Sequence, residues 1–182
     1  MKWLIASDIH GSAYYCEKLL EAYKKEQAER LILLGDILYH GPRNDLPGQY
    51  STKDVAAMLN AMKDEVCGVR GNCDAEIDQV MLEFPMFADY MLLPLGRQTV
   101  FVTHGHLWNT EKMPPLRPGD VLLHGHTHVP VCEQAGQAYY LNPGSVSIPK
   151  GGSWHGYILL EDRTFIWKDL DGCEHMTFTL PE

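Results

Sequence analysis

Short runs of apolar residues recur along the first two thirds of the chain, and each run gives way abruptly to polar residues. The runs cover residues 2–6, 30–34, 65–69, 99–103 and 121–124. Apolar runs of this length, without polar alternation, are typical of strands that are buried on both faces of a sheet. We therefore predict a strand at each of these five positions.

Two of the intervening segments have the spacing of helices. Apolar side chains recur three and four residues apart between Tyr15 and Tyr23, in a segment otherwise rich in Glu and Lys. Ser51 is followed three residues later by Asp54, which resembles a capping box and predicts a helix that reaches Met62. Strands that alternate with helices in this way predict a βαβαβ unit, and hence a parallel sheet covered by helices.

The last third of the chain has a different pattern, in which short predicted strands are separated by turns. Strands are predicted at residues 129–133, 138–141, 157–160 and 164–168, and we expect them to pair in antiparallel fashion. Two long loops, at residues 39–50 and 142–153, are rich in Gly, Pro and Asn and are expected to serve function. Neither a repeat nor a linker divides the 182 residues, so we predict a single domain over residues 1–182.

Composition and charge narrow the classes of partner and location. A formal net charge of -9 disfavours a nucleic-acid scaffold, although a small anionic substrate held by bound cations remains compatible with it. The apolar run at the N-terminus is too short for a signal sequence, and no later run is long enough for a membrane span. The five cysteines are scattered, without a C-x-x-C pair, so we predict neither a disulfide framework nor a structural zinc site. A cytoplasmic location is the simplest expectation.

Candidate chemistry lies in the polar clusters that directly follow the predicted strands. The five clusters are Asp8-Ile9-His10, Gly35-Asp36, Gly71-Asn72-Cys73-Asp74, His104-Gly105-His106 and Gly125-His126-Thr127-His128. In an α/β sheet the carboxyl ends of parallel strands converge on one crevice, so these residues can meet there as ligands. This layout predicts a two-metal hydrolase.

The spacing within the clusters supports metal binding, although each cluster alone has a simpler interpretation. Asp8 and His10 are two residues apart, as are His126 and His128, so each pair can present both side chains to one ion. The two oxygens of Asp36 could bridge two cations. Alternatively, Asp8 could cap a helix, Asp36 could sit in an ordinary turn, and the histidines could be surface features. Mixed nitrogen and oxygen ligands indicate a transition metal rather than calcium.

Taken in order, these motifs resemble the signature of the calcineurin-like metallophosphoesterases. The matching elements are Asp8-x-His10, Gly35-Asp36, Gly71-Asn72-x-Asp74, His104 and Gly125-His126-x-His128, and the match runs to about residue 148. Residues 35–43, 70–74 and 141–149 resemble the small bacterial phosphodiesterases of this family more closely still. The resemblance implies an α/β fold in which two mixed β-sheets pack as a sandwich flanked by helices.

The resemblance also implies a ligand set. One metal ion would be held by Asp8, His10, Asp36 and His128, and the other by Asp36, Asn72, His104 and His126, with Asp36 as the bridge. His106 and His124 have no ligand position in this scheme. Mn²⁺ is the first expectation for both ions, and Fe, Zn, Ni and Co are compatible with the same ligands.

Two cations about 3.5 to 4 Å apart can share a hydroxide and clamp the phosphate oxygens during in-line displacement, so we expect hydrolysis of a small phosphodiester. Asp36, Asn72 and His104 are the candidate catalytic residues. Cys73 departs from the family pattern, because many members have a histidine there that assists the leaving oxygen. Substrate contacts are predicted for Cys73, His40, Arg43 and Asn44, and the alternative for the last three is an exposed polar loop. Asp74 could orient a ligand or cap a helix that starts at Ala75, and of the two we favour the cap.

Two other functions remain open at this stage. One is a phosphomonoesterase or protein phosphatase of the same superfamily, which Cys73 disfavours because a thiol replaces the histidine. The other is a non-catalytic interaction scaffold similar to the retromer subunit, which the complete set of proposed ligands disfavours. A homo-oligomer is also compatible with the sequence.

Overall fold

The first sheet is built around the βαβαβ unit that the sequence predicts. In the computed structural model, which describes residues 1–181, β1 (Lys2–Ala6), β2 (Arg30–Leu33) and β3 (Val66–Gly68) are parallel neighbours. On the other side of β1, the strands β9 (Gly156–Glu161), β10 (Thr164–Asp169) and β11 (Glu174–Thr179) follow in antiparallel order. The result is a six-stranded mixed sheet.

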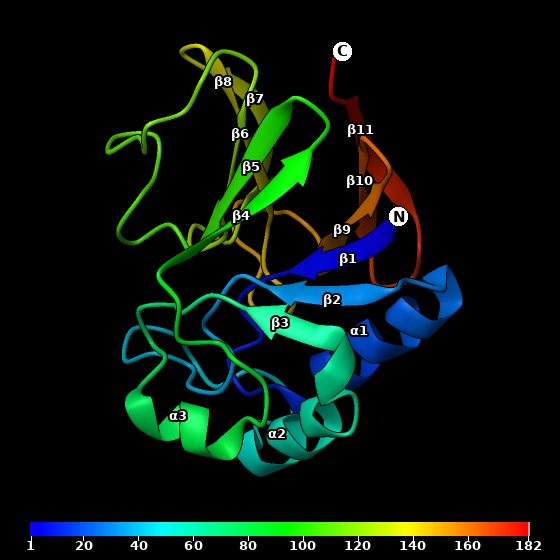
Figure 1. Ribbon diagram of the computed structural model, residues 1–182. Coiled ribbons are helices and arrows are strands. Elements are labelled where there is room, and N and C mark those ends of the chain that lie inside the picture. Colours follow the sequence, from blue (N-terminus) through cyan, green and yellow to red (C-terminus); the bar gives the residue numbers. More distant parts are fainter. Residues whose placement is uncertain (182) are drawn as a thin grey trace.

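The second sheet has five strands in the order β4-β5-β6-β8-β7. They are β4 (Tyr90–Leu95), β5 (Gln98–Thr103), β6 (Val121–Leu123), β7 (Pro130–Ala135) and β8 (Ala138–Pro143). The β4–β5 and β7–β8 pairs are antiparallel, whereas β6 is parallel to both β5 and β8. The expectation of purely antiparallel pairing after residue 128 is therefore wrong for β8, which returns beside β6 in the same direction. The two mixed sheets with flanking helices confirm the expected fold (Figure 1).

Three helices accompany the first sheet. α1 (Ala13–Glu26) begins after Ser12, whose hydroxyl accepts a hydrogen bond from the Tyr15 N–H. α2 (Thr52–Asn60) begins after Ser51 as predicted, but it ends before Met62 and is followed by a short 3₁₀ turn, η1 (Lys63–Glu65). α3 (Glu76–Met81) follows the loop after β3. In Figure 1 these helices lie below the first sheet, away from the second.

The core explains why the first strands read as continuous apolar runs. Leu4 and Ala6 belong to the apolar cluster between the first sheet and the helices α1 and α2. Ile5, the residue between them in β1, belongs to the cluster between the two sheets. Successive strand residues point to opposite faces, so a strand covered on both faces has apolar side chains at every position. Trp167 is fully buried between the sheets, and its indole donates to the carbonyl of Asn142.

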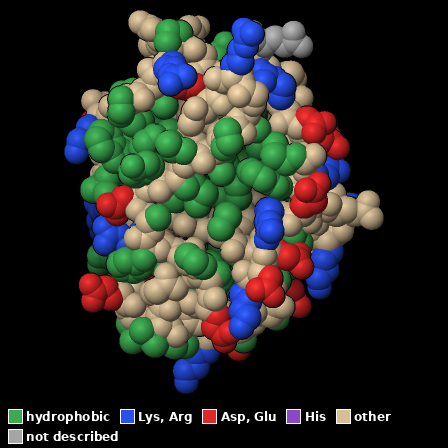
Figure 2. All heavy atoms as spheres, viewed as in Figure 1, with side chains coloured by type: hydrophobic (Ala, Val, Ile, Leu, Met, Phe, Trp, Pro, Cys, Tyr) green, Lys and Arg blue, Asp and Glu red, His purple; other side chains and the backbone are tan. Residues whose placement is uncertain are grey.

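The outer surface also has apolar areas. Figure 2 shows hydrophobic side chains gathered over the region of β4 and β5, where Tyr90 and Leu92 are exposed. Within residues 1–181, no helix has both the length and the apolar character that crossing a membrane requires.

Candidate metal centre

The predicted ligands come from the loops that follow five strands. Asp8 and His10 follow β1, Asp36 follows β2, Asn72 follows β3, His104 follows β5, and His126 and His128 follow β6. The structure brings all of them together, in two adjacent groups. The first cluster contains Asp8, His10 and His128, and the second contains Asp36, Asn72, His104 and His126.

Unusual backbone conformations present these side chains. Asp8, His10, Asp36, His126 and His128 all have a positive φ, between 49° and 65°. A positive φ is uncommon for residues other than glycine and is tolerated best by Asn, Asp and His. Such conformations cost free energy and persist only where the surroundings enforce them, which is a feature of functional sites.

Glycines make the close approach of these loops feasible. A Cβ atom at Gly71 would collide with the Asp36 carboxylate, and one at Gly125 would collide with the side chain of Ser7. Any side chain at either position would therefore displace a predicted ligand or the loop that carries it.

In the first cluster, three ligand atoms surround one point. The Asp8 Oδ1 lies 3.2 Å from the His128 Nε2 and 3.5 Å from the His10 Nε2, and the two Nε2 atoms are 3.2 Å apart. Ligands bound at about 2.1 Å from a divalent cation are separated from one another by about 3.0 to 3.5 Å. The spacing of the first cluster matches that of a coordination sphere.

The second cluster has similar spacing. The His104 Nε2 lies 3.1 Å from the Asn72 Oδ1, 3.1 Å from the His126 Nδ1 and 3.4 Å from the Asp36 Oδ2. The same Asp36 oxygen is 3.8 Å from the His10 Nε2 of the first cluster. Asp36 therefore stands between the two clusters, where a bridging carboxylate would have to be.

Hydrogen bonds on the far side of three rings orient the histidines. The Nδ1 atoms of His10, His104 and His128 lie 2.8, 2.7 and 2.6 Å from the carbonyls of Tyr39, Leu34 and Ile148, respectively. A ring that donates from Nδ1 carries a lone pair on Nε2, which is the form that binds a metal. Since neutral His10 and His128 would then point two lone pairs at each other, a cation between them fits the arrangement.

The buried carboxylate of Asp8 gives an independent test of this fit. Its Oδ2 accepts hydrogen bonds from the Ser7 hydroxyl at 2.5 Å and from the His126 N–H at 3.0 Å. Its Oδ1 is buried and has no hydrogen-bond partner among the described residues. A buried carboxylate oxygen without a partner is costly, so its position between two imidazoles fits a metal ligand.

The electrostatics of the site agree with a cluster of ionised carboxylates. Burial raises the pKa of Asp8, but the neighbouring imidazoles of His10, His128 and His104 outweigh burial and hold the pKa well below its usual range. Burial likewise raises the pKa of Asp36, while His104 lowers it by more. Burial lowers the pKa of His104, but Asp36 and Asp8 together raise it to about 9. The metal-free site thus favours a proton on His104, in the place where a cation would bind.

Asp74 does not cap the helix that follows it, so that prediction is wrong. Its carboxylate accepts hydrogen bonds from the N–H groups of Asp36, Ile37 and Gly71, at 2.7, 2.9 and 2.7 Å. α3 is instead capped by Asp78, which accepts from the Ala75 N–H at 2.9 Å. Asp74 is drawn away from the helix because three backbone donors surround it, and it holds the loop that carries Asp36.

The loop after β8 supports the site from the other side. The hydroxyls of Ser145 and Ser147 donate to the carbonyl of Asp8, at 2.8 and 3.1 Å. The same loop supplies the Ile148 carbonyl that orients His128. Sequence reasoning identified this loop as functional but could not assign the serine contacts, because the two serines lie 137 and 139 residues from Asp8 along the chain.

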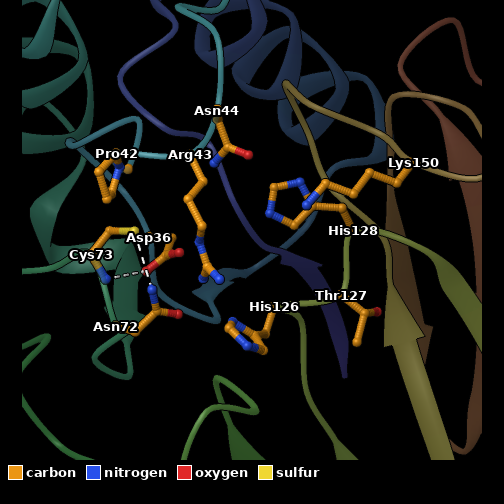
Figure 3. Close-up of a pocket in the computed structure, with 11 residues that line it drawn as sticks. Asp36, Pro42, Arg43, Asn44, Asn72, Cys73, His126, Thr127, His128 and Lys150 are labelled. Atoms are coloured by element: carbon orange, nitrogen blue, oxygen red, sulfur yellow. Dashed lines mark hydrogen bonds between the residues drawn. The ribbon is translucent and has the colours of Figure 1, made fainter.

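A cavity of about 450 Å³ opens over the two clusters, and Figure 3 shows the side chains that line it. Arg43 reaches into the cavity toward Asn72 and His126, and Asn44 lies beside it. Lys150 lines the opposite side, and the sequence analysis did not identify it. His40 does not line this cavity. Its ring stands edge-on to the rings of Tyr39 and Tyr50.

Cys73 also lines the cavity, with its side chain beside Asp36 (Figure 3). Its Sγ accepts a hydrogen bond from the Asn72 Nδ2 at 3.3 Å. Burial, together with the charge of Asp36, raises the pKa of the Cys73 thiol to about 12. A protonated thiol is a poor nucleophile, so Cys73 is not suited to be the attacking group.

His106 and His124 are not part of either cluster. Burial and the charges of neighbouring histidines lower the pKa of His106 to about 4. Burial lowers that of His124 to about 4 as well, and its ring stacks on Tyr140. Both rings therefore stay neutral near pH 7.

Known proteins resemble this chain over most of its length. The calcineurin-like phosphoesterase superfamily domain matches residues 1–164. Phosphodiesterase YfcE of Escherichia coli (strain K12) is 49% identical over 162 residues, covering 89% of this chain and 88% of YfcE. The solved structure of the phosphoesterase YfcE from E. coli superposes with a TM-score of 0.96 at 44% identity, covering 100% of both chains. Vps29 of Chaetomium thermophilum, at 16% identity, also covers 100% of both chains with a TM-score of 0.63 and shares the fold. The chain belongs to the calcineurin-like phosphoesterase superfamily.

Proposed function

We propose that this protein is a metal-dependent phosphodiesterase with two divalent cations in its active site. The observation that carries the proposal is the pair of adjacent ligand clusters, with a buried Asp8 oxygen that no group within residues 1–181 satisfies. The 49% identity to a protein named as a phosphodiesterase supports the same reaction class.

The donor set suits divalent transition metals. Asp8, His10, Asp36 and His128 would hold one ion, and Asp36, Asn72, His104 and His126 the other. Mn²⁺ is our first choice because the family resemblance suggests it and the mixed nitrogen and oxygen donors permit it; Fe, Zn, Ni and Co suit the same donors. Two such ions supply Lewis-acid charge to a phosphate group and activate water near neutral pH.

The chain's own residues would bind and orient the diester. Arg43 and Lys150 place two cationic side chains around the cavity of a protein whose net charge is -9. A guanidinium matches the geometry of two phosphate oxygens, so Arg43 is the better candidate for a direct contact. Asn44 lies next to Arg43 and can donate to an ester or phosphate oxygen.

The residue at position 73 bears on the choice between diesters and monoesters. A neutral thiol is a weak proton donor to a departing alkoxide, so substrates whose leaving oxygen is already acidic should react best. We therefore favour diesters over alkyl monoesters, and over the phosphoserine and phosphothreonine substrates of a protein phosphatase.

A comparison of substrates tests this proposal. The Mn²⁺-loaded protein should hydrolyse bis(4-nitrophenyl) phosphate with a kcat/KM well above that for 4-nitrophenyl phosphate or for phosphoserine. Asp36→Ala serves as the control for contaminating phosphatase. A preference for phosphoserine would assign the protein to the phosphomonoesterases. Failure to hydrolyse any of the three compounds with two metals bound would favour an interaction scaffold.

A reducing compartment such as the cytoplasm suits this function. All five cysteines are free, and three of them are half-buried. Free thiols are typical of proteins in a reducing compartment. A small phosphodiester is the partner that we propose, and the cavity volume of about 450 Å³ suits a small molecule.

A further inference from the structure

A second cavity, of about 480 Å³, adjoins the metal cavity. It lies between the loop after β2, the start of α2 and one side of α3. The side chains that give it its character are those of Leu38, Tyr39, Tyr50, Cys73, Ile77 and Met81. None of the proposed metal ligands lines it.

The two cavities meet at Cys73, which lines both. The Cys73 Sγ, a ring nitrogen of His10 and an Asp36 carboxylate oxygen all lie within 4.8 Å of one another. Cys73 separates the two cavities with only a short side chain. A substituent on a phosphate bound at the metal clusters would therefore enter the second cavity by extending past Cys73. Tyr39 links the two sites as well, because its carbonyl orients His10 while its ring lines the second cavity.

The walls of the second cavity are mainly apolar. Tyr39, Ile77 and Met81 are large apolar residues that are all exposed, and Ile77 is 63% exposed. The charged residues there are Lys53, which is exposed, and Asp78, whose carboxylate is engaged by the Ala75 N–H. Such walls give a second phosphate or a sugar few partners, whereas they can take apolar surface out of water.

We propose that the second cavity binds an apolar ester substituent of the substrate, of the size of an aromatic ring, while the phosphate sits at the metal clusters. This inference rests on the proposed function, because it needs a phosphate ester in the first cavity. It assigns the protein to diesters with at least one hydrophobic ester group, rather than to diesters with two small polar groups.

The surface of α3 offers a matched control. Hydrophobic side chains are visible over this helix at the lower left of Figure 2. Val80 is on the same helix as Ile77 and is 76% exposed, but it does not line the second cavity. Ile77→Gln and Val80→Gln therefore make the same kind of change in the same helix, and neither residue is buried in the core.

The experiment measures the binding of two phosphonates to the metal-loaded protein by calorimetry. Phenylphosphonate and methylphosphonate share one anionic head group, so the ratio of their affinities reports on the substituent. We expect phenylphosphonate to bind about tenfold more tightly, as is typical when an apolar group enters an apolar pocket. Ile77→Gln should reduce this ratio about threefold or more and leave methylphosphonate unchanged, whereas Val80→Gln should leave the ratio as it is. Met81→Gln repeats the test from a second wall.

Turnover provides the second measurement. 4-Nitrophenyl phenyl phosphate and 4-nitrophenyl methyl phosphate have the same leaving group, and Ile77→Gln should lower kcat/KM for the phenyl ester selectively. If the protein hydrolyses neither diester but keeps its preference for phenylphosphonate, the proposed function fails and the assignment of the cavity stands. Equal affinity for the two phosphonates, binding of neither, or an unchanged ratio in Ile77→Gln would overturn the inference. Loss of self-association in Ile77→Gln with an unchanged ratio would overturn it as well, and would assign the surface to a second copy of the chain.

Discussion

Removing the Asp74 carboxylate should destabilise the loop that carries Asp36. In Asp74→Ala, the N–H groups of Asp36, Ile37 and Gly71 lose their acceptor. A hydrogen bond to a charged group contributes about 1.5 to 3 kcal/mol. The gain from the three bonds is offset in part by burial, which raises the pKa of Asp74 and makes its charge costly. We expect a loss of about 3 kcal/mol in the free energy of unfolding, taking about 1 kcal/mol net for each bond.

Asp78→Ala is the matched control. Asp78 is 9% exposed and Asp74 is 8% exposed, but the Asp78 carboxylate accepts from the Ala75 N–H and, among the described residues, makes no hydrogen bond to the Asp36 loop. Loss of a helix cap costs about 1 kcal/mol. Asp74→Asn keeps one accepting oxygen and should lie between the two alanine variants.

Urea denaturation of the metal-free proteins measures these differences, and calorimetry measures their affinity for Mn²⁺. Because Asp74 positions the proposed bridging ligand, its alanine variant should also lose about 10- to 100-fold in metal affinity, as is usual for residues that orient ligands. The reasoning is refuted if Asp74→Ala is no less stable than Asp78→Ala and binds Mn²⁺ with the parental affinity.

Three further predictions concern the chemistry of the site. The pKa of His104 is about 9 in the metal-free protein, against an ordinary value of 6.5. Since a cation binds only the neutral ring, calorimetric affinity for Mn²⁺ should fall by about tenfold per pH unit for each proton displaced as pH drops from 9 to 6.5. The stability of the metal-free protein should change in the opposite direction: in urea denaturation, the contribution of His104 to the free energy of unfolding should be complete below pH 6.5 and lost toward pH 9. An affinity for Mn²⁺ that does not change with pH would contradict both statements. Arg43→Gln should lower kcat/KM for diesters about 10- to 100-fold with unchanged metal content, because a charged hydrogen bond to phosphate is lost; steady-state kinetics at parental rates would remove Arg43 from the substrate site. Cys73→Ala should leave diester hydrolysis largely intact, and Cys73→His should raise turnover of alkyl monoesters more than of activated diesters; a collapse of diester hydrolysis in Cys73→Ala would show that the thiol takes part.

The sequence predicted the strands that are buried on both faces but missed two strands at sheet edges. β1 and β2 were recognisable because apolar side chains fill both of their faces. β4 contains Pro94, which disfavours a strand interior, and it is an edge strand in which such a residue is tolerated. β11 is the other missed strand, and its exposed polar residues hide the alternation that pairs it with β10.

The candidate ligands were predictable because they follow the strands directly and share the signature of a known family. The groups that orient these ligands could not be predicted, because they are backbone groups of other segments of the chain, such as the carbonyls of Leu34 and Ile148. Asp74 was misjudged for the same reason: local spacing favoured a helix cap, but its partners on the Asp36 loop lie 37 and 38 residues away. Lys150 reaches the cavity from a loop whose path the sequence does not specify.

The central claim is that two cations held on either side of Asp36 are required for hydrolysis, and a metal titration tests it most directly. Protein stripped with a chelator is titrated with Mn²⁺ while bound metal and hydrolysis of bis(4-nitrophenyl) phosphate are measured on the same samples. The account predicts no turnover without metal and full recovery as two ions bind per chain, with Asp36→Ala impaired in both metal binding and turnover. Full activity of the metal-free protein, or parental metal content and turnover in Asp36→Ala, would contradict it.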